Sequence, residues 1–177
     1  LNGQALPFVE GGVSIDAGLR RAAAALLEDF KRPLSSLGYQ DALYDLAHAL
    51  QAAAGGAVAI KRVNREAVAG ARDYIEASLS SGFSLEDLER ATGHCRWQLS
   101  RDFRAMFGTS PYRYLTLRRL DLARRLMRDG GAIAEIALDC GFSDQSHLGR
   151  VFKQAYGLTP KAWVRRARGS HDHSRTA

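Results

Sequence analysis

Hydrophobic positions recur every three or four residues along most of the chain, a spacing that predicts amphipathic helices rather than strands. The first predicted helix runs from about Ser14 to Arg32 and stops at Pro33, which cannot continue the backbone hydrogen-bond ladder. The second runs from about Gly38 to Ala54 and stops at a pair of glycines. Matched apolar stripes on two consecutive helices predict an antiparallel hairpin. The stripes are Leu19, Ala23, Leu26 and Phe30 in the first helix, and Tyr39, Leu43, Leu46 and Leu50 in the second.

The apolar faces of this hairpin leave two interpretations open. In one, the two helices cover each other and the neighbouring part of the chain. In the other, their stripes form the seam of a homodimer. The candidate seam consists of Leu19, Leu26, Phe30, Leu43, Leu46 and Leu50. Residues 55–63, which follow the hairpin, have the composition of a linker.

A repeated pattern occupies the second half of the chain. One copy spans residues 85–111 and the other residues 133–160, each with two apolar-periodic segments separated by a glycine-containing turn. The spacing from the first leucine of the second segment to the closing Ser/Thr-Pro is the same in both copies. A repeated helix, turn and helix on a basic background predicts a DNA-binding protein with two helix-turn-helix units.

The remaining helix boundaries follow from capping residues. Short polar side chains accept the free N–H groups of a first helical turn and so mark where helices begin. Asp87 lies three residues after Ser84, which is the spacing of a capping box. Pro111 suits the first position of a long helix that ends near Asp129 and bridges the two repeats. The last helix is expected to end near Ala167. The predicted starts are Asn64, Ser84, Ser110, Ser143 and Thr159.

Charge divides the chain into an acidic and a basic part. Residues 1–60 contain six acids and four bases, a net −2, so the remainder of this +6 chain carries +8. Lysine and arginine at phosphates release condensed counterions, so the basic part suits a polyanionic partner. A solvated basic face is the alternative interpretation of the charge alone.

Several classes of site and location are not expected. Cys95 and Cys140 have no metal-like spacing, so we expect neither a zinc site nor a disulfide framework, and no other metal or cofactor. No apolar run approaches the roughly 18–20 residues that span a bilayer, so we expect no membrane association. The chain begins without methionine or a signal-peptide pattern, which suggests the back portion of a longer protein.

The second helix of each repeat, about 96–107 and 144–156, presents one outward polar strip. At about 100° per residue, residues placed between roughly 100° and 200° from Leu99 or Leu148 face away from the core. Phe103, Met106, Phe152 and Ala155 are expected to face inward. The candidate base-facing residues are Arg96, Trp97, Ser100, Arg101 and Arg104, and then Gln145, Ser146, Gly149, Arg150 and Lys153.

These side chains have the chemistry of base recognition. Arginine can bind guanine O6 and N7, glutamine can bind adenine N6 and N7, and an aromatic ring can pack on thymine methyl groups. Trp97 could instead fold back over its own helix or the preceding one, and Arg101 and Arg150 could form intramolecular ion pairs. Helix N-termini could supply backbone N–H groups to phosphates. These termini are at Ser84, Ser110 and Thr159.

The stretch IAEIALDCGFSDQSHLGRVFKQAYGLTP, residues 133–160, resembles the two-helix-turn-helix DNA-binding domain of the AraC/XylS transcription regulators. The resemblance covers about residues 65–168 and implies an all-α fold with seven helices, in which residues 111–128 bridge the two units. It implies a bacterial, cytoplasmic regulator, an activator or a repressor, with double-stranded DNA and RNA polymerase as partners. The positions matching the family's base contacts are Trp97, Ser100 and Arg101, and then Gln145, Ser146 and Arg150.

The opening hairpin resembles the helical pair that follows a jelly-roll effector domain in many such regulators and contributes to dimerisation. We therefore expect residues 1–60 to be the remnant of an effector and dimerisation domain, residues 61–168 the DNA-binding domain, and residues 169–177 a disordered tail. A small-molecule effector would bind only through a domain absent from this chain.

The first unit departs from the family pattern at two places. Glu89 occupies a position where alanine is usual, and His94-Cys95 stands where Met-Ser is commoner, although cysteine is a poor helix cap. We expect this unit to be less rigid or differently aimed than the second. Two other functions are alternatives to DNA reading: a DNA alkyl-repair enzyme with a nucleophilic cysteine, and a helical bundle for protein interaction. We expect no enzyme, because Cys140 faces the packing of the turn, Cys95 has no evident base beside it, and the cysteine cluster of such repair modules is absent.

Overall fold

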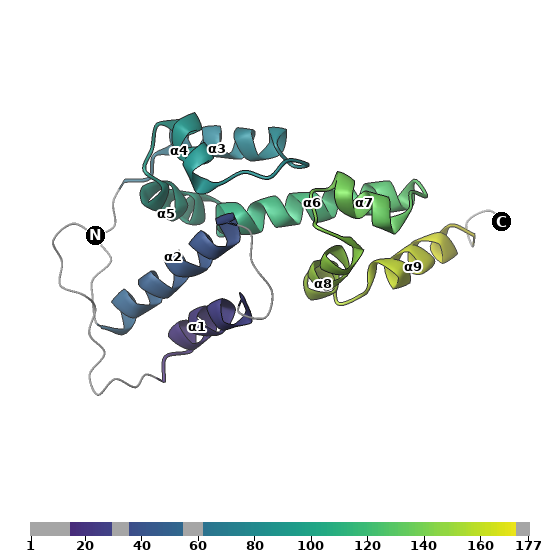
Figure 1. Cartoon of the computed structure of the whole chain (residues 1–177), viewed down its shortest axis with the longest axis horizontal. Coiled ribbons are helices and arrows are strands. Elements are labelled where there is room, and N and C mark those ends of the chain that lie inside the picture. Colours follow the sequence, from purple (N-terminus) through teal and green to yellow (C-terminus); the bar gives the residue numbers. More distant parts are fainter. Residues whose placement is uncertain (1–14, 30–35, 55–61, 173–177) are drawn as a thin grey trace. The chain divides into compact units, whose positions relative to one another are not determined.

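The structure, a computed structural model, describes residues 15–29, 36–54 and 62–172 of the chain (Figure 1). All secondary-structure elements in these residues are helices, as the all-α fold class predicts. The seven helices from α3 to α9 match the number that the family resemblance implies. The helices are α1 (Ala17–Asp29), α2 (Ser36–Ala53), α3 (Arg65–Ala77), α4 (Leu85–Thr92), α5 (Arg96–Phe107), α6 (Pro111–Arg128), α7 (Ile133–Asp139), α8 (Gln145–Tyr156) and α9 (Pro160–Asp172).

The chain packs as two units. Unit 1 contains the described parts of residues 1–72 and 83–112, and unit 2 contains those of residues 73–82 and 113–177. The first helix-turn-helix, α4 and α5, lies in unit 1, and the second, α7 and α8, lies in unit 2. Helices α3 and α6 each run from one unit into the other. The hairpin α1–α2 lies in unit 1 with the first helix-turn-helix, so the boundary expected near residue 60 is not where the structure divides.

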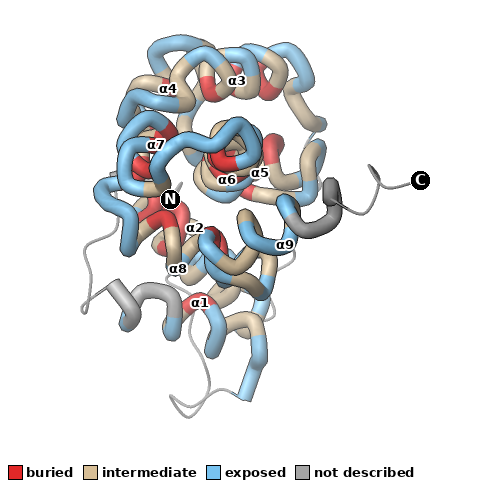
Figure 2. Tube along the Cα trace, turned by 90° about the vertical axis from the view of Figure 1, so that its right-hand side faces the viewer, coloured by how far each residue is buried: buried red, intermediate tan, exposed pale blue. Residues whose placement is uncertain are grey.

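The core of unit 1 forms from apolar faces with helical spacing. In α3, Val68 and Ala71 are fully buried, and Figure 2 shows the buried positions of this helix on one side only. The α5 residues Leu99 and Phe103 are also buried, as their predicted phases require. Met106 is 45% exposed, so its predicted inward orientation is wrong. The ring of Phe107 packs on Phe103 instead, with the ring centroids 4.7 Å apart.

Unit 2 has a continuous core beneath its helix-turn-helix. Phe152 of α8 is fully buried, and its ring centroid lies 4.7 Å from that of Tyr156 and 6.1 Å from that of Trp163. Ala155 is exposed, contrary to its predicted phase, because Tyr156 takes the inward place beside Phe152. The buried cluster is Leu120, Ala123, Met127, Ile136, Ala137, Cys140, Phe142, Leu148 and Phe152.

The helix ends follow most of the predicted caps. Ser84 and Asp87 form the predicted capping box at α4. Gly93 ends α4 with φ 67°, a left-handed conformation that a residue with a Cβ adopts only with strain. The predicted cap Ser143 is wrong, because the Asp144 side chain accepts the His147 N–H at 2.7 Å and caps α8.

The last helix is longer than predicted. Helix α9 continues to Asp172 rather than ending near Ala167, so residues 169–172 are helical and not part of a disordered tail. Residues 168–172 contain no proline, and the single Gly169 weakens a helix by only about 1 kcal/mol. Within the described residues, no helix is both long enough and apolar enough to cross a bilayer.

The predicted hairpin packs as two contacting helices, α1 and α2. Ala22 of α1 and Ala42 of α2 are buried. Phe30 and the side chain of Leu26 lie outside the described residues. The other members of the candidate seam, Leu19, Leu43, Leu46 and Leu50, are half-buried, so the helices cover part of each other's apolar surface.

Candidate nucleic-acid interface

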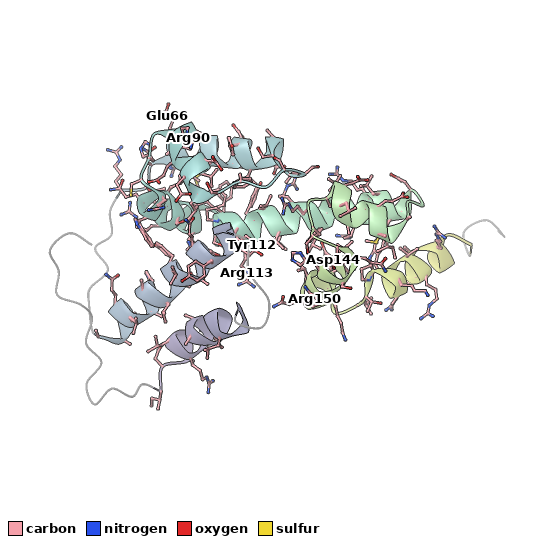
Figure 3. All side chains as sticks on the ribbon, in the orientation of Figure 1. Glu66, Arg90, Tyr112, Arg113, Asp144 and Arg150 are labelled. Atoms are coloured by element: carbon pink, nitrogen blue, oxygen red, sulfur yellow. The ribbon has the colours of Figure 1, made fainter. Side chains whose placement is uncertain are left out.

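The second helix-turn-helix presents α8 as an anchored helix with a free polar strip. On its inner side Leu148 and Phe152 are fully buried, which fixes the rotation of the helix. On its outer side the predicted residues Gln145, Ser146, Arg150 and Lys153 are all exposed. Figure 3 shows Asp144 at the start of this helix and Arg150 projecting from it. Among the described residues, no carboxylate forms an ion pair with Arg150 or Lys153.

The turn before α8 holds this strip in place. The backbone N–H of His147 donates to Asp144 and keeps the pKa of that carboxyl below its ordinary value. The His147 ring meets Phe142 edge-on, with the centroids 5.4 Å apart, and its Nδ1 lies 3.1 Å from the Ser143 hydroxyl. Burial and the nearby Arg150 lower the pKa of His147, which favours a neutral imidazole here.

Gly149 lies between the long side chains of the α8 strip. A Cβ built at this position would have no heavy atom within 4 Å, so packing inside the unit does not require glycine. Glycine in a helix interior costs roughly 0.5–1 kcal/mol relative to alanine. An unexplained glycine on a helix surface is what close approach to a partner would require.

The outward strip predicted for α5 is largely engaged within unit 1. Ser100 is only 2% exposed, so its predicted presentation to DNA is wrong in this conformation. Arg101 forms an ion pair with its neighbour Asp102 at 2.6 Å, which is the alternative interpretation of this residue. Arg96 pairs with Glu86 of α4 at 2.6 Å. Trp97 remains 49% exposed.

Helix α2 covers the remaining part of the α5 strip. Arg104 Nη2 donates to Asp41 Oδ1 and, at 2.9 Å, to Asp45 Oδ1. The Arg104 guanidinium also lies over the Tyr44 ring, 4.3 Å from its centroid. That ring stacks on Trp97 with centroids 6.0 Å apart and an interplanar angle of 21°. Trp97 therefore folds back over neither its own helix nor the preceding one but against α2.

The departures of the first unit from the family pattern have a structural explanation. Cys95 makes no side-chain capping bond, and Glu89 supplies the missing acceptor by taking the backbone N–H of Arg96 at 2.8 Å. His94 Nδ1 lies 2.9 Å from the Thr92 carbonyl oxygen, and its Nε2 lies 2.6 Å from Asn64 Nδ2. The carboxylate and the imidazole thus brace the turn before α5 instead of leaving it loose.

The three helix N-termini differ in their fitness for phosphate. Ser84 is followed by Glu86 and Asp87, whose charges oppose an anion there. Ser110 is 3% exposed and donates to Asp41 Oδ2 at 2.6 Å, so the expected phosphate contact is not accessible in this conformation. The α9 terminus at Thr159 is exposed and has no acidic residue in its first turn. It is the best suited of the three.

Sequence reasoning missed the α2 residues that occupy the first strip. Asp41, Tyr44 and Asp45 lie at positions i, i+3 and i+4, which places them on one helix face. Helix α2 contains no lysine or arginine, so this face is purely acidic and aromatic. That pattern is readable in the sequence, and its complement is the arginine-rich α5.

The two cysteines lie in different surroundings. Cys140 is fully buried in the unit 2 core, and burial raises the pKa of its thiol to about 11. Cys95 is exposed at the start of α5. In the described part of the chain, no cluster of three or more histidine, cysteine, aspartate or glutamate side chains could hold a metal ion.

Two helix-turn-helix units in tandem, one with a solvent-facing basic strip, define the class of double helix-turn-helix DNA-binding proteins. The comparisons agree with this class. A family model described as a helix-turn-helix domain matches residues 88–166. The multiple antibiotic resistance protein MarA of Salmonella typhimurium is 32% identical over 104 residues, which are 58% of this chain and 80% of that protein. The chain belongs to the AraC-type family of helix-turn-helix transcriptional regulators.

Two further matches extend the comparison. The probable transcriptional regulator LumQ of Photobacterium leiognathi is 31% identical over 56% of this chain, and the match spans only 41% of LumQ. The DNA-binding domain of AdpA, solved in complex with a target DNA, superposes with a TM-score of 0.56 at 25% identity. That match covers 59% of this chain and 96% of the AdpA domain. The relatives are transcriptional regulators rather than enzymes, which removes the alkyl-repair alternative.

Proposed function

We propose that this chain regulates transcription by reading a DNA site with two recognition helices, α8 in one major groove and α5 in the next. The observation that carries the proposal is the α8 strip, where Arg150 and Lys153 are exposed and form no ion pair among the described residues. Unpaired cations beside Gln145 and Ser146 suit a surface that meets acceptor-rich base edges and phosphates.

The proposed roles follow from side-chain chemistry and position. Arg150 reads guanine, Gln145 reads adenine at the N-terminal edge of the helix, and Ser146 contacts either base. Lys153 and the α9 terminus at Thr159 contact phosphates. The 18-residue α6 spans roughly 27 Å, whereas major grooves on one DNA face recur about every 34 Å. A site read by both helices would therefore use an offset of the readers from α6 or a bend of the DNA.

A substitution at Arg150 tests this assignment. Sites would first be selected from a random duplex pool by the chain itself. Arg150→Ala should then weaken the selected site by about 1–3 kcal/mol, roughly 5- to 150-fold, and relax selectivity at one base pair. Arg90→Ala removes the same side chain from α4, where Arg90 is exposed and pairs with Asp87, and should change affinity less than twofold.

Equal weakening of every sequence by Arg150→Ala would make Arg150 a phosphate contact and remove its base-reading role. If the chain selects no sequence and binds duplexes without preference, the proposed function itself is wrong. If the loss of any exposed arginine lowers DNA affinity through its charge alone, Arg90→Ala should weaken binding as much as Arg150→Ala does.

Further partners belong to the same proposal. In the hairpin, Leu27 is 62% exposed and Tyr39 is 46% exposed. We propose that α1 and α2 use this apolar surface to form a homodimer contact. We also propose that the regulator acts in the cytoplasm, where it would meet DNA and RNA polymerase. Sedimentation over a hundredfold range of concentration should show a monomer–dimer equilibrium that Leu27→Glu abolishes. A concentration-independent monomer would remove the dimer from the proposal.

A further inference from the structure

The two recognition helices differ in what holds their cations. Each arginine of α5 is paired with a carboxylate of unit 1: Arg96 with Glu86, Arg101 with Asp102, and Arg104 with Asp41 and Asp45. By contrast, no ion pair within the described residues engages Arg150 or Lys153 of α8. The helix expected to read the first half-site is therefore neutralised within its own unit, and the helix expected to read the second is not.

The cover on α5 comes from a separate helix and not from neighbouring turns. Asp41 and Asp45 lie 63 and 59 residues before Arg104, so no local geometry requires the contact. Helix α2 has two aspartates and no lysine or arginine, a net −2. Helix α5 has three arginines and one aspartate, a net +2. The two helices are thus matched in charge.

The α2 residues also match the chemistry of a DNA groove. Carboxylate oxygens accept from the Arg104 guanidinium as guanine O6 and N7 or a phosphate would. The Tyr44 ring stacks on Trp97, an apolar contact of the kind that a sugar or thymine methyl group would make, and His48 stacks on Tyr44 in turn. Asp41 also takes the Ser110 hydroxyl, at the N-terminus expected to meet a phosphate. One face of α2 thus engages three residues that are predicted to contact DNA, namely Arg104, Trp97 and Ser110.

We propose that α2 is an intramolecular competitor of DNA for α5, with Asp41, Tyr44 and Asp45 occupying the surface that would enter the first groove. The inference rests on the proposed function, since it takes α5 as a reader. In the conformation described, the chain reads DNA through α8 alone. A second half-site is read only by molecules in which α2 has left α5.

Competition of this kind has a measurable size. A site that needs both helices is bound with an affinity reduced by the fraction of molecules in which α5 is free. If α2 covers α5 in about nine molecules of ten, removing the cover raises that affinity about tenfold. The affinity for a duplex that carries only the α8 half-site should not change.

The experiment selects binding sites from a random duplex pool with the full 177-residue chain and with two variants, Asp45→Asn and Asp41→Asn/Asp45→Asn. The wild-type chain should select one conserved block. The double variant should select two blocks whose centres lie about 10 bp apart, the spacing of successive major grooves on one face. Its affinity for the two-block duplex should exceed that of the wild-type chain about tenfold.

A matched control separates release of α5 from a simple gain of positive charge. Glu66→Gln makes the same change of charge as Asp45→Asn in the same unit, on an exposed residue that Figure 3 places at the start of α3, away from α2. This variant should still select one block and should bind within twofold of the wild-type chain. Asp45 has a side chain that is 53% exposed, so the single variant keeps its fold even if loss of the buried Asp41 charge disturbs the double variant.

A readout without DNA follows the contact itself. The chain has two tryptophans, so Trp163→Phe leaves Trp97 as the single reporter. In that background, Asp45→Asn should increase quenching of Trp97 fluorescence by acrylamide, and Glu66→Gln should not. Unchanged helix content by circular dichroism shows that a gain in quenching comes from movement of α2 and not from unfolding.

Three results would overturn the inference while leaving the proposed function intact. If the wild-type chain already selects two blocks, α2 does not keep α5 from DNA. If a folded Asp45→Asn variant binds the two-block duplex no more tightly than the wild-type chain, or less tightly, then α2 supports the DNA-bound conformation instead of competing with DNA. An equal gain in the Glu66 variant makes the effect one of net charge. Selection of no site by the wild-type chain would instead remove the proposed function, and the inference with it.

Discussion

The cap of α8 is decided by a single residue that the sequence pattern did not distinguish from its neighbour. Ser143 and Asp144 are both good N-caps, and a shift of one residue lies within the uncertainty of any helix boundary read from sequence. In the structure Asp144 has the extended backbone of a cap and accepts the His147 N–H, whereas the Ser143 hydroxyl bonds to the Asp144 carboxylate and lies beside the His147 ring. The choice depends on three-dimensional geometry that periodicity does not carry.

This cap predicts a dependence of stability on pH. The His147 N–H lowers the pKa of Asp144, so the folded chain favours the carboxylate more than the unfolded chain does. The stabilisation is therefore complete above the unfolded pKa, near pH 4, and is lost as the pH falls through the lower folded pKa. Asp144→Asn, a neutral cap, should narrow the difference in melting temperature between pH 7 and pH 3, as followed by circular dichroism.

Ser143 provides the comparison for that experiment. Asp144→Ala removes the cap and should lower the melting temperature at pH 7, while Ser143→Ala should lower it much less. A larger effect from Ser143→Ala than from Asp144→Ala would show that Ser143, the start predicted from the sequence, caps α8.

The burial of Ser100 marks the limit of phase arguments for single residues. A turn of 100° per residue shows which side of α5 faces away from Leu99, and that assignment correctly buries Phe103. It does not show which other element packs on the outward side. Ser100 is 2% exposed and Arg104 is bound by Asp41 and Asp45, contacts that join residues about 60 positions apart.

At the scale of the helix, α8 combines a strong inward anchor with a glycine that its own unit does not need. Gly149 has no neighbour within 4 Å of a built Cβ. Gly149→Ala should therefore stabilise the protein by roughly 0.5–1 kcal/mol and raise the melting temperature by about 1–4 °C. If α8 lies in a groove with Gly149 against the DNA, the same methyl group should lower affinity for the selected site severalfold.

Gly70 in α3 offers a matched helix glycine. A Cβ there would meet only the Thr92 methyl carbon, at an ordinary contact distance of 3.7 Å. Gly70→Ala should raise the melting temperature by a similar amount and leave DNA affinity unchanged. If Gly149→Ala raises stability without weakening binding, the Gly149 side of α8 does not face DNA.

Helix placement was predictable because its determinants are local. Apolar spacing, the Ser84–Asp87 capping box and the Ser/Thr-Pro starts define α3 to α8 within a few residues. The end of α9 was not predictable, since its apolar positions stop near Ala167 while the backbone continues as helix to Asp172. A helix can continue beyond its apolar face when no proline ends it.

For the whole molecule, the sequence predicted two DNA-reading units and a separate hairpin. The structure does not separate the hairpin from the first of these units. The composition shift near residue 60 suggested a boundary between domains. The structure instead packs the described parts of α1 and α2 with α4 and α5 in unit 1. Charge complementarity between α2 and α5 links these segments across that apparent boundary, and composition alone does not reveal it.

The number of engaged readers also predicts how binding responds to salt. The logarithm of the binding constant falls with the logarithm of salt concentration with a slope of about −0.9 per neutralised phosphate. If each reader neutralises roughly four phosphates, binding through α8 alone gives a slope near −4 and a loss of about a hundredfold between 50 and 200 mM salt. Engagement of α5 as well should double the slope, so the Asp41→Asn/Asp45→Asn variant should lose more than a thousandfold over the same range on the two-block duplex. Fluorescence anisotropy of this variant with the two-block duplex and with a duplex that carries only the α8 half-site would measure both slopes. Equal slopes on the two duplexes would show that α5 adds no phosphate contacts and does not enter the second groove.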